Sequence, residues 1–404
     1  MICINSLNIG LNRFLLLAVG LWPYQQSKLV RLQLISFFCI LTTFILCQLT
    51  TLLTSQCTPD FIMKILSSVL FFMMFVIKYR YFNVNIKFVQ NFLEQLQHIC
   101  NELTDKNEIN IIKQYASSAK RYTTTLTLLA VLIISAFILY QTGLYIFNIL
   151  LPIHNKSRPC SLLFVTEYFV DQERYFYLIT LHTYAAFGIG SAVMLATGTI
   201  LIVCMQYACG MFQIASYRIA RTTNTLEKSN LKNENLTYKG LIYAVNMHCK
   251  AMKFCDLILS RFQVMFFLLI LIGVICGSLN FFLIFQVISF KYDTSELLLP
   301  LIGVIVHFSY SSIGNYIAQE VIDHNNNIFV TVYNIQWYLA PLQVQRMLLF
   351  LLQRGTKEFT MNIAGLFVGS LESAATVRKI SFKKCINRNI FYMKKSKQFI
   401  SHYS

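Results

Sequence analysis

The sequence predicts an all-α membrane protein with seven transmembrane helices, a cytoplasmic N-terminus and an extracellular C-terminus. Hydrophobic residues make up 56% of its 404 residues and charged residues only 13%, whereas soluble domains carry about 25% charged residues. The apolar residues gather in runs of roughly 20, the length that a helix needs to cross a bilayer. Charged residues fall between these runs, where loops would place them. A soluble protein does not bury this much apolar surface.

Seven apolar runs define the predicted spans. The first six lie at residues 34–54, 61–82, 124–150, 176–206, 262–290 and 297–321, and the last at 359–382. The third, fourth and fifth runs are longer than a bilayer requires, so we expect them to tilt or to project from it. The chain thus divides into a cytoplasmic N-terminal segment (1–33), the first six spans (34–321), a cytoplasmic anchor segment (322–358), the last span (359–382) and a basic tail (383–404).

The N-terminal segment contains the apolar run 14–22, which is short for a signal peptide. It lacks a clear cleavage site and ends in Trp22-Pro23, so we favour an uncleaved segment that lies along the membrane surface over a signal peptide.

Orientation follows from the basic residues, which give the chain a net charge of +17. Lysines and arginines collect in the N-terminal segment and in the loops after the second, fourth and sixth spans. The basic residues from Lys78 to Arg121 are counted in the loop after the second span. Cytoplasmic loops of membrane proteins carry such an excess of basic residues. The positive charge therefore does not indicate nucleic-acid binding. The sequon Asn155-Lys156-Ser157 then lies outside the cell, where Asn155 is a candidate for glycosylation.

Cysteines and catalytic motifs give little sign of chemistry. None of the twelve cysteines forms a Cys-x-x-Cys pair, so we expect no metal site. Cys57 and Cys160 fall in two predicted outer loops and are candidates for a disulfide. The sequence has no phosphate-binding loop, nucleophile elbow or His-Glu-x-x-His motif. We therefore expect neither enzymatic activity nor a cofactor.

The outer halves of the spans carry aromatic and polar-tipped side chains. Small-molecule pockets are mostly apolar and contain a few polar groups, so these side chains are candidates for binding a small volatile ligand. Ordinary helix packing is the alternative for each of them, including the two histidines. The candidates are Phe71, Phe72, Phe75, Tyr140, Thr142, Tyr145, Tyr177, His182, Phe187, His307 and Tyr310.

The C-terminal part combines an amphipathic stretch, 333–354, with the apolar run 359–382. Leu348, Leu349, Leu351 and Leu352 give the first stretch an apolar face, which indicates a cytoplasmic helix that leads into the last span. Two unrelated amphipathic helices are the alternative interpretation.

Three stretches together resemble a known family. The first is 12–24, with Gly20-Leu21-Trp22-Pro23; the second runs from Tyr333 through Trp337-Tyr338 to Arg354; the third covers 359–381, with Ser370-Leu371-Glu372-Ser373. In these motifs the chain resembles the insect odorant receptors, and most closely their expanded hymenopteran members.

This resemblance implies an odorant-binding subunit of a ligand-gated, non-selective cation channel in the plasma membrane. Such subunits form heterotetramers with a shared odorant co-receptor, and the partners implied are that co-receptor, a volatile ligand and membrane lipid, with no nucleic acid. The amphipathic stretch would anchor subunits to one another, and the last span would line the pore. The anchor residues implied are Tyr333, Trp337, Tyr338, Arg346 and Leu349, and the gate residues are Val368 and Leu371.

Three other classes of membrane protein are alternatives. An insect gustatory receptor shares the topology but normally has a different C-terminal motif. A G-protein-coupled receptor has the opposite orientation, and its Asp-Arg-Tyr and Asn-Pro-x-x-Tyr motifs are missing here. A transporter would carry more buried charge and paired broken helices. The chain departs from the odorant receptors at Lys383-Lys384, which end the last apolar run early and begin the basic tail.

Overall fold

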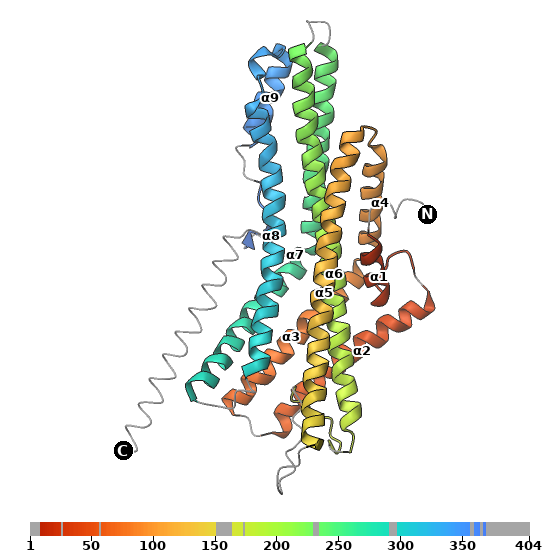
Figure 1. The fold of residues 1–404 in the computed structure, drawn as a ribbon, viewed down its shortest axis with the longest axis vertical. Coiled ribbons are helices and arrows are strands. Elements are labelled where there is room, and N and C mark those ends of the chain that lie inside the picture. Colours follow the sequence, from red (N-terminus) through yellow and green to blue (C-terminus); the bar gives the residue numbers. More distant parts are fainter. Residues whose placement is uncertain are drawn as a thin grey trace, which may run out of the picture.

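The structure, a computed structural model, describes residues 9–25, 27–55, 58–150, 164–172, 174–228, 234–290, 297–355, 359–363 and 367–368. In these parts of the chain every element is helical except for one pair of two-residue strands. The elements are α1 (Gly10–Ala18), α2 (Lys28–Thr54), α3 (Pro59–Val84), α4 (Ile86–Glu102), α5 (Lys106–Leu150), α6 (Phe176–Lys228), α7 (Glu234–Phe290), α8 (Leu298–Asn334), the 3-10 helix η2 (Trp337–Leu339), α9 (Leu342–Gly355), β1 (Asn362–Ile363) and β2 (Phe367–Val368). The helices form an elongated bundle, with α9 at one end beside the end of α8 (Figure 1).

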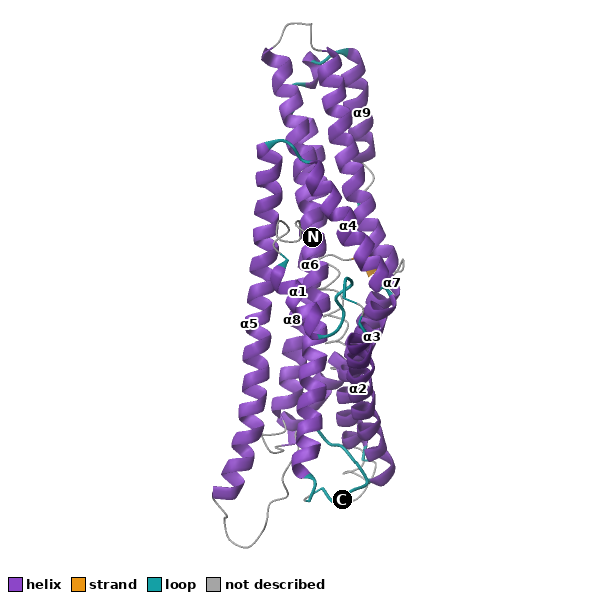
Figure 2. Cartoon of the chain, turned by 90° about the vertical axis from the view of Figure 1, so that its right-hand side faces the viewer, coloured by secondary structure: helices purple, strands orange, loops and turns teal. Residues whose placement is uncertain are grey.

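Six helices in the described ranges are long and apolar enough to cross a membrane. The first six predicted spans lie almost entirely within them, so the chain is a multi-pass membrane protein. Three of these helices are much longer than the predicted spans that they contain. Helix α5 already begins at Lys106, α6 continues to Lys228, and α7 begins at Glu234. These extensions lie side by side and lengthen the bundle toward the α9 end (Figure 2).

Local sequence signals set where several helices begin. The Ser27 hydroxyl accepts a hydrogen bond of 3.2 Å from the Val30 amide at the start of α2. Thr58 caps α3 in the same way, and Pro59 occupies the first helical position, where its missing N–H costs nothing. The Asp105 carboxylate accepts a 2.9 Å bond from the Asn107 amide at the start of α5. Short polar residues therefore satisfy the unpaired amides of these helix ends.

The core surrounds α6, which contacts α5, α7 and α8. Tyr207 and Phe212 on α6 are fully buried there. By contrast, α5 exposes a row of large apolar side chains, among them Leu128, Leu132 and Leu139. Such a patch is unfavourable in water, but lipid tails are as apolar as leucine. The exposed face of α5 is therefore suited to contact with lipid.

The N-terminal segment packs into the protein rather than only lying along a membrane surface. Helix α1 contacts α5 and α6, and Leu16 and Trp22 are buried. The Tyr79 hydroxyl donates a 3.0 Å hydrogen bond to the Val19 carbonyl, which fastens α3 to the end of α1. Gly20 turns the chain with φ of +73°, a conformation that side-chain-bearing residues rarely adopt.

The C-terminal part differs from its prediction in two places. The predicted helix 333–354 is interrupted, because α8 ends at Asn334 and α9 begins only at Leu342. Pro341 lies at this break, with Ala340 extended before it, since the residue before a proline avoids helical geometry. The run 359–382 does not begin as a helix: β1 and β2 pair in antiparallel fashion, with Ile363 opposite Phe367. Branched and aromatic side chains favour such extended pairs. The rest of that run lies outside the described residues.

Candidate functional site

Seven phenylalanines from four helices and one connecting segment come together in the half of the bundle away from α9. This aromatic cluster consists of Phe44 on α2, Phe71, Phe72 and Phe75 on α3, Phe137 on α5, Phe164 in the segment before α6, and Phe187 on α6. Its ring centroids lie 4.5 to 6.1 Å apart along a continuous chain of contacts. These are favourable separations for aromatic pairs.

Phe164 joins the two halves of the aromatic cluster. Its ring lies 5.4 Å from Phe72 and 6.1 Å from Phe137. On one side Phe72 contacts Phe44 at 4.6 Å, and on the other Phe137 stacks on Phe187 at 4.5 Å. The connecting segment therefore covers the cluster where the helices α2, α3, α5 and α6 meet.

Polar groups lie at two edges of the aromatic cluster. The His182 ring is 5.6 Å from Phe44, and its Nδ1 is 2.6 Å from the Tyr168 hydroxyl. Its Nε2 lies 3.2 Å from the Thr43 hydroxyl. Burial raises the pKa of the Tyr168 hydroxyl, so this group stays protonated near neutral pH. At the other edge, the hydroxyls of Thr142 and Tyr184 are 3.4 Å apart. The site thus combines a large apolar wall with a few hydrogen-bonding groups.

A glycine on α6 allows the aromatic cluster to pack tightly. The ring of Phe75 lies directly on Gly190, so a Cβ at Gly190 would be 2.7 Å from Phe75 Cγ and closer to two other ring atoms. Helices α3 and α6 approach at this point because Gly190 has no side chain.

Lys78 contacts Tyr310 about one helical turn beyond Phe75 on α3. The Lys78 side chain is 0% exposed, and its Nζ donates a hydrogen bond to the Tyr310 hydroxyl oxygen on α8. Nζ also lies 4.4 Å from the centroid of the Tyr310 ring. The basic-residue pattern of the sequence groups Lys78 with the following loop, whereas the structure places it inside α3. Its position within the predicted span 61–82 was the available signal.

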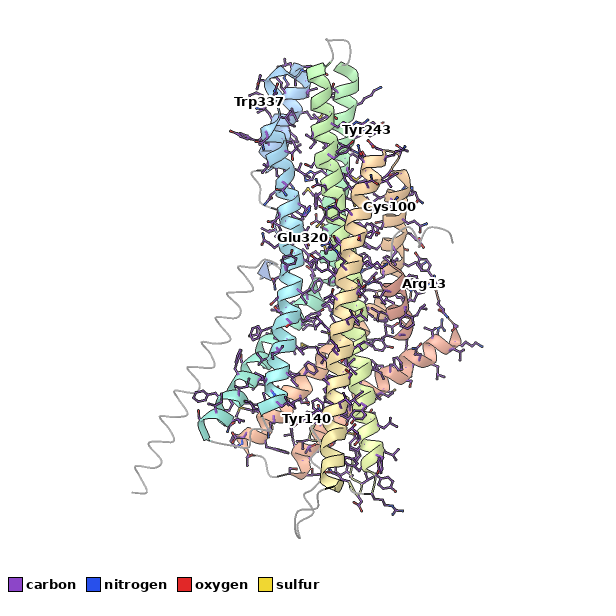
Figure 3. All side chains as sticks on the ribbon, in the orientation of Figure 1. Arg13, Cys100, Tyr140, Tyr243, Glu320 and Trp337 are labelled. Carbon is purple, nitrogen blue, oxygen red and sulfur yellow. The ribbon has the colours of Figure 1, made fainter. Side chains whose placement is uncertain are left out.

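Several candidates lie apart from this arrangement. Tyr177 is 70% exposed, and its ring lies 6.0 Å from that of the neighbouring Phe176. His307 packs on α7, where a Cβ at Gly273 would overlap its ring. Tyr140 lies toward the far end of α5 (Figure 3), and the side chain of Tyr145 is outside the described parts, as are Cys57, Asn155 and Cys160.

Five further members of the site were not among the candidates from the sequence: Phe44, Phe137, Phe164, Tyr168 and Tyr184. Three of them, Phe44, Phe137 and Tyr184, lie within predicted spans. Phe44 follows the aromatic pair Phe37-Phe38 by about two turns of the same helix. This repeat of aromatic residues is the one sequence signal that would have indicated an aromatic face on the first span.

The opposite end of the bundle carries the predicted anchor residues. Tyr333, Trp337, Tyr338, Arg346 and Leu349 are all exposed there, near the position of Trp337 in Figure 3. Of the apolar face of α9, Leu348 and Leu351 are buried and Leu349 is exposed. One part of this face therefore holds α9 on the bundle, and the other lies on the surface. Val368 falls in β2, and the second gate candidate, Leu371, lies outside the described residues.

Ion pairs hold the end of α4 and the start of α5 against α7 and α6. Arg218 on α6 donates two hydrogen bonds to the Glu108 carboxylate, at 2.6 and 2.8 Å. Lys250 on α7 reaches Glu102 at 2.9 Å, and this hydrogen bond lowers the pKa of the Glu102 carboxyl. Deeper in the bundle, His248 on α7 lies 2.9 Å from the side-chain oxygen of Asn325 on α8. Paired charges thus link the ends of the long helices.

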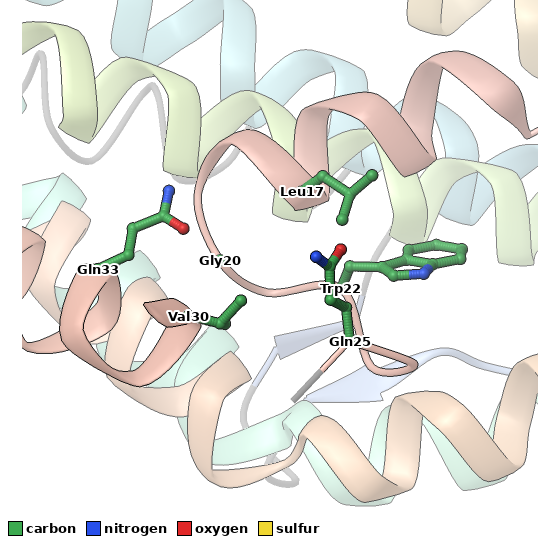
Figure 4. A pocket seen from close by; sticks show the side chains of 6 residues that line it. All are labelled: Leu17, Gly20, Trp22, Gln25, Val30 and Gln33. Atoms are coloured by element: carbon green, nitrogen blue, oxygen red, sulfur yellow. The ribbon is translucent and has the colours of Figure 1, made fainter. Parts of the chain in front are cut away.

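One surface pocket lies beside α1. It has a volume of about 310 Å³ and is lined by Leu17, Gly20, Trp22, Gln25, Val30 and Gln33 (Figure 4). The Gln33 amide donates a 2.8 Å hydrogen bond to the Ala18 carbonyl across this hollow. Within the described ranges, no group of three or more His, Cys, Asp and Glu side chains is placed to hold a metal ion.

Comparison with known proteins connects this arrangement to one family. A family model described as 7tm Odorant receptor matches residues 58–382, which is well over half of the chain. The insect olfactory receptor OR5 from Machilis hrabei, solved in complex with eugenol, is similar with a TM-score of 0.74 and 16% sequence identity over 95% of this chain and 96% of that one. A second structure of the same receptor gives a TM-score of 0.70 and 15% identity over the same shares. No curated protein matches the chain.

Proposed function

Because the chain belongs to the 7tm odorant receptor family, we propose that it is the odorant-binding subunit of a ligand-gated, non-selective cation channel in the plasma membrane. It acts as a receptor rather than an enzyme, and it forms a heterotetramer with an odorant co-receptor. The observation that carries this proposal is the aromatic cluster, in which four helices and one connecting segment meet around phenylalanine rings. The eugenol complex of a similar receptor supports a small organic ligand.

In this proposal the odorant binds against the aromatic cluster, with His182 and Thr142 at its polar edges. Burial of an apolar molecule contributes roughly 25 cal/mol per Å². Binding opens the channel only to the extent that the odorant has higher affinity for the open arrangement. Since the cluster joins α2, α3, α5 and α6, small shifts of its rings change how these four helices pack.

Subunits assemble in this proposal through the exposed anchor residues at the α9 end. Exposed tyrosine, tryptophan and arginine side chains are enriched in protein interfaces. This end is cytoplasmic, because the predicted orientation puts the basic loops on that side. Residues 359–382 of this chain contribute to the pore.

The test is whole-cell current in cells that express the chain, a co-receptor, or both, against a panel of volatile compounds. We expect an inward cation current that requires both chains and an odorant, without the delay of a second messenger. Current from the co-receptor alone that is unchanged by this chain, despite its presence at the cell surface, would contradict the proposal.

A matched pair of variants tests the aromatic cluster within the same assay. Phe72→Leu alters the buried centre of the cluster while keeping an apolar side chain, and we expect it to raise the EC50 of the active odorants. Leu139→Ala changes a residue that is 71% exposed on α5 and is expected to leave the EC50 unaltered. Equal effects of both substitutions at equal surface expression would place the ligand elsewhere.

A further inference from the structure

A basic side chain is enclosed within a membrane-spanning helix at Lys78. Its exposed fraction is 0%, and it lies within the span Pro59–Val84. Ionisable groups at such positions are costly, and they commonly mark the path or binding site of a ligand or ion. A structural role alone would be served by an apolar side chain of similar length.

The Lys78 ammonium has spare capacity for an acceptor. It can donate three hydrogen bonds, and within the described residues its one acceptor is the Tyr310 hydroxyl oxygen. None of the ion pairs among those residues includes Lys78. A negatively charged ligand would therefore supply the counter-charge that this part of the protein does not provide.

Nζ of Lys78 is enclosed by α6 and α8. Gly198 on α6 forms one side, where a Cβ would lie 3.9 Å from Nζ and 3.6 Å from Tyr310 Cε2, both ordinary contact distances. Tyr310 forms another side and is 36% exposed. A ligand head group that reaches Nζ therefore has to displace the Tyr310 ring.

Lys78 also continues the aromatic cluster along α3. Phe71, Phe75 and Lys78 are spaced by four and three residues, which places them on one face of the helix. Phe75 contacts Phe71 at 4.8 Å and Phe72 at 5.5 Å. Helical rise separates Lys78 from Phe72 by roughly 9 Å along the axis. The Lys78 amine thus lies next to the phenylalanine side chains of α3, at the end of the aromatic cluster.

We propose that Lys78 binds the carboxylate of an acidic volatile ligand, whose apolar tail lies along Phe75 into the aromatic cluster. This inference rests on the proposed odorant-receptor function and names its ligand class. The carboxylate replaces the Tyr310 hydroxyl as the partner of Nζ, in a charge-assisted hydrogen bond that is stronger than a neutral one. The low dielectric of the site strengthens this attraction further.

Ligand binding at Lys78 also changes a contact between helices. The Lys78–Tyr310 hydrogen bond joins α3 to α8, and the carboxylate breaks it by taking its place. The ligand therefore has a higher affinity for the arrangement of α3 and α8 in which this contact is broken. A gating transition requires such a difference in affinity between two arrangements.

The experiment compares hexanoic acid with hexanal, hexan-1-ol and methyl hexanoate in cells that express this chain with a co-receptor. Near neutral pH the acid is ionised, and the other three share its tail without its charge. We expect the acid to have the lowest EC50. A receptor that responds to neutral volatiles but not to hexanoic or octanoic acid would overturn the inference while leaving the proposed function intact.

Substitutions at the site make the test specific. Lys78→Met keeps the length of the side chain and is expected to raise the EC50 of the acid about ten- to a hundredfold, while that of hexan-1-ol changes less than threefold. Lys87→Met, at an exposed lysine of α4, is the matched control and should alter neither value. Equal loss of acid and alcohol responses in Lys78→Met, at normal surface expression, would contradict a role in binding the carboxylate.

Two further measurements cover failure of a variant or of the assay. If Lys78→Met does not reach the surface, Lys78→Arg keeps the charge and should preserve the order of the four ligands; loss of that order would overturn the inference. If no volatile gives current with both chains present, the proposed channel function fails. Thermal stabilisation of the purified chain by hexanoate and not by hexan-1-ol then supports the carboxylate site separately, and equal stabilisation by both refutes it.

Discussion

Substitution of Gly190 on α6 by alanine most directly tests its contact with Phe75 on α3, a member of the aromatic cluster. The new Cβ would lie 2.7 Å from Phe75 Cγ and nearer to the ring edge, whereas carbon atoms in contact are normally about 3.5–4.0 Å apart. Phe75 is buried, so its ring has no free space to enter. Either α3 and α6 separate, or the ring leaves its preferred rotamer.

Overpacking of this kind costs about 1–3 kcal/mol. Gly188 provides a matched control on the same helix, because nothing lies within 4 Å of a Cβ built there. Both alanines gain the same helix propensity, about 1 kcal/mol relative to glycine, so the difference between the two variants isolates the collision with Phe75. For a chain of 404 residues, this difference corresponds to a fall of roughly 1–4 °C in Tm.

The assay is thermal unfolding of the detergent-solubilised chain at one fixed scan rate, since unfolding of such proteins is commonly irreversible. We expect Gly190→Ala to unfold at a lower temperature than Gly188→Ala. Phe75→Leu removes the ring edge, so Gly190→Ala should cost much less in that background, as a double-mutant cycle would reveal. Equal unfolding temperatures for the two alanine variants, or no rescue by Phe75→Leu, would refute the close packing described here.

Three further predictions concern other contacts. Glu108→Gln removes the charge that holds Arg218, and because both side chains are largely enclosed, we expect a loss of about 2–3 kcal/mol in thermal unfolding; Arg218→Met in the same background should recover part of it, and no recovery would argue against the pair. Leu16→Ala empties a position that is 1% exposed and should cost about 2–4 kcal/mol, whereas a segment that only rests on a membrane would lose almost nothing. Tyr168→Phe removes the hydroxyl 2.6 Å from His182 Nδ1 and should raise the odorant EC50 roughly two- to tenfold; an unchanged dose–response curve would remove this edge from the binding site.

The sequence by itself determined the membrane-spanning character of the chain and most of the spans. A helix that crosses a bilayer needs a long apolar run, and such runs can be identified from the order of residues alone. The start of α6 at Phe176 and the end of α7 at Phe290 coincide with the predicted ends for this reason. Family-specific residues such as those of 12–24 added the odorant receptor identity, which composition could not supply.

The tertiary structure decided how far the helices extend and which side chains meet. Outside a bilayer, helix formation depends on packing partners, so the projecting parts of α5, α6 and α7 were not readable from apolar runs. Phe44, Phe164 and Phe187 come from distant parts of the chain, and only the crossing of α2, α3, α5 and α6 brings them together.

Burial of Lys78 is the plainest case of a property that the sequence does not contain. A lysine near the end of an apolar run is ordinarily a loop residue or one whose charge reaches the membrane surface. Its enclosure depends on Tyr310 and Gly198, which lie on two other helices. The sequence alone thus determined which segments enter the membrane, because that depends on each segment's own transfer free energy. The packing of helices against one another determined what lies at the centre of the site, because that depends on residues far apart in the chain.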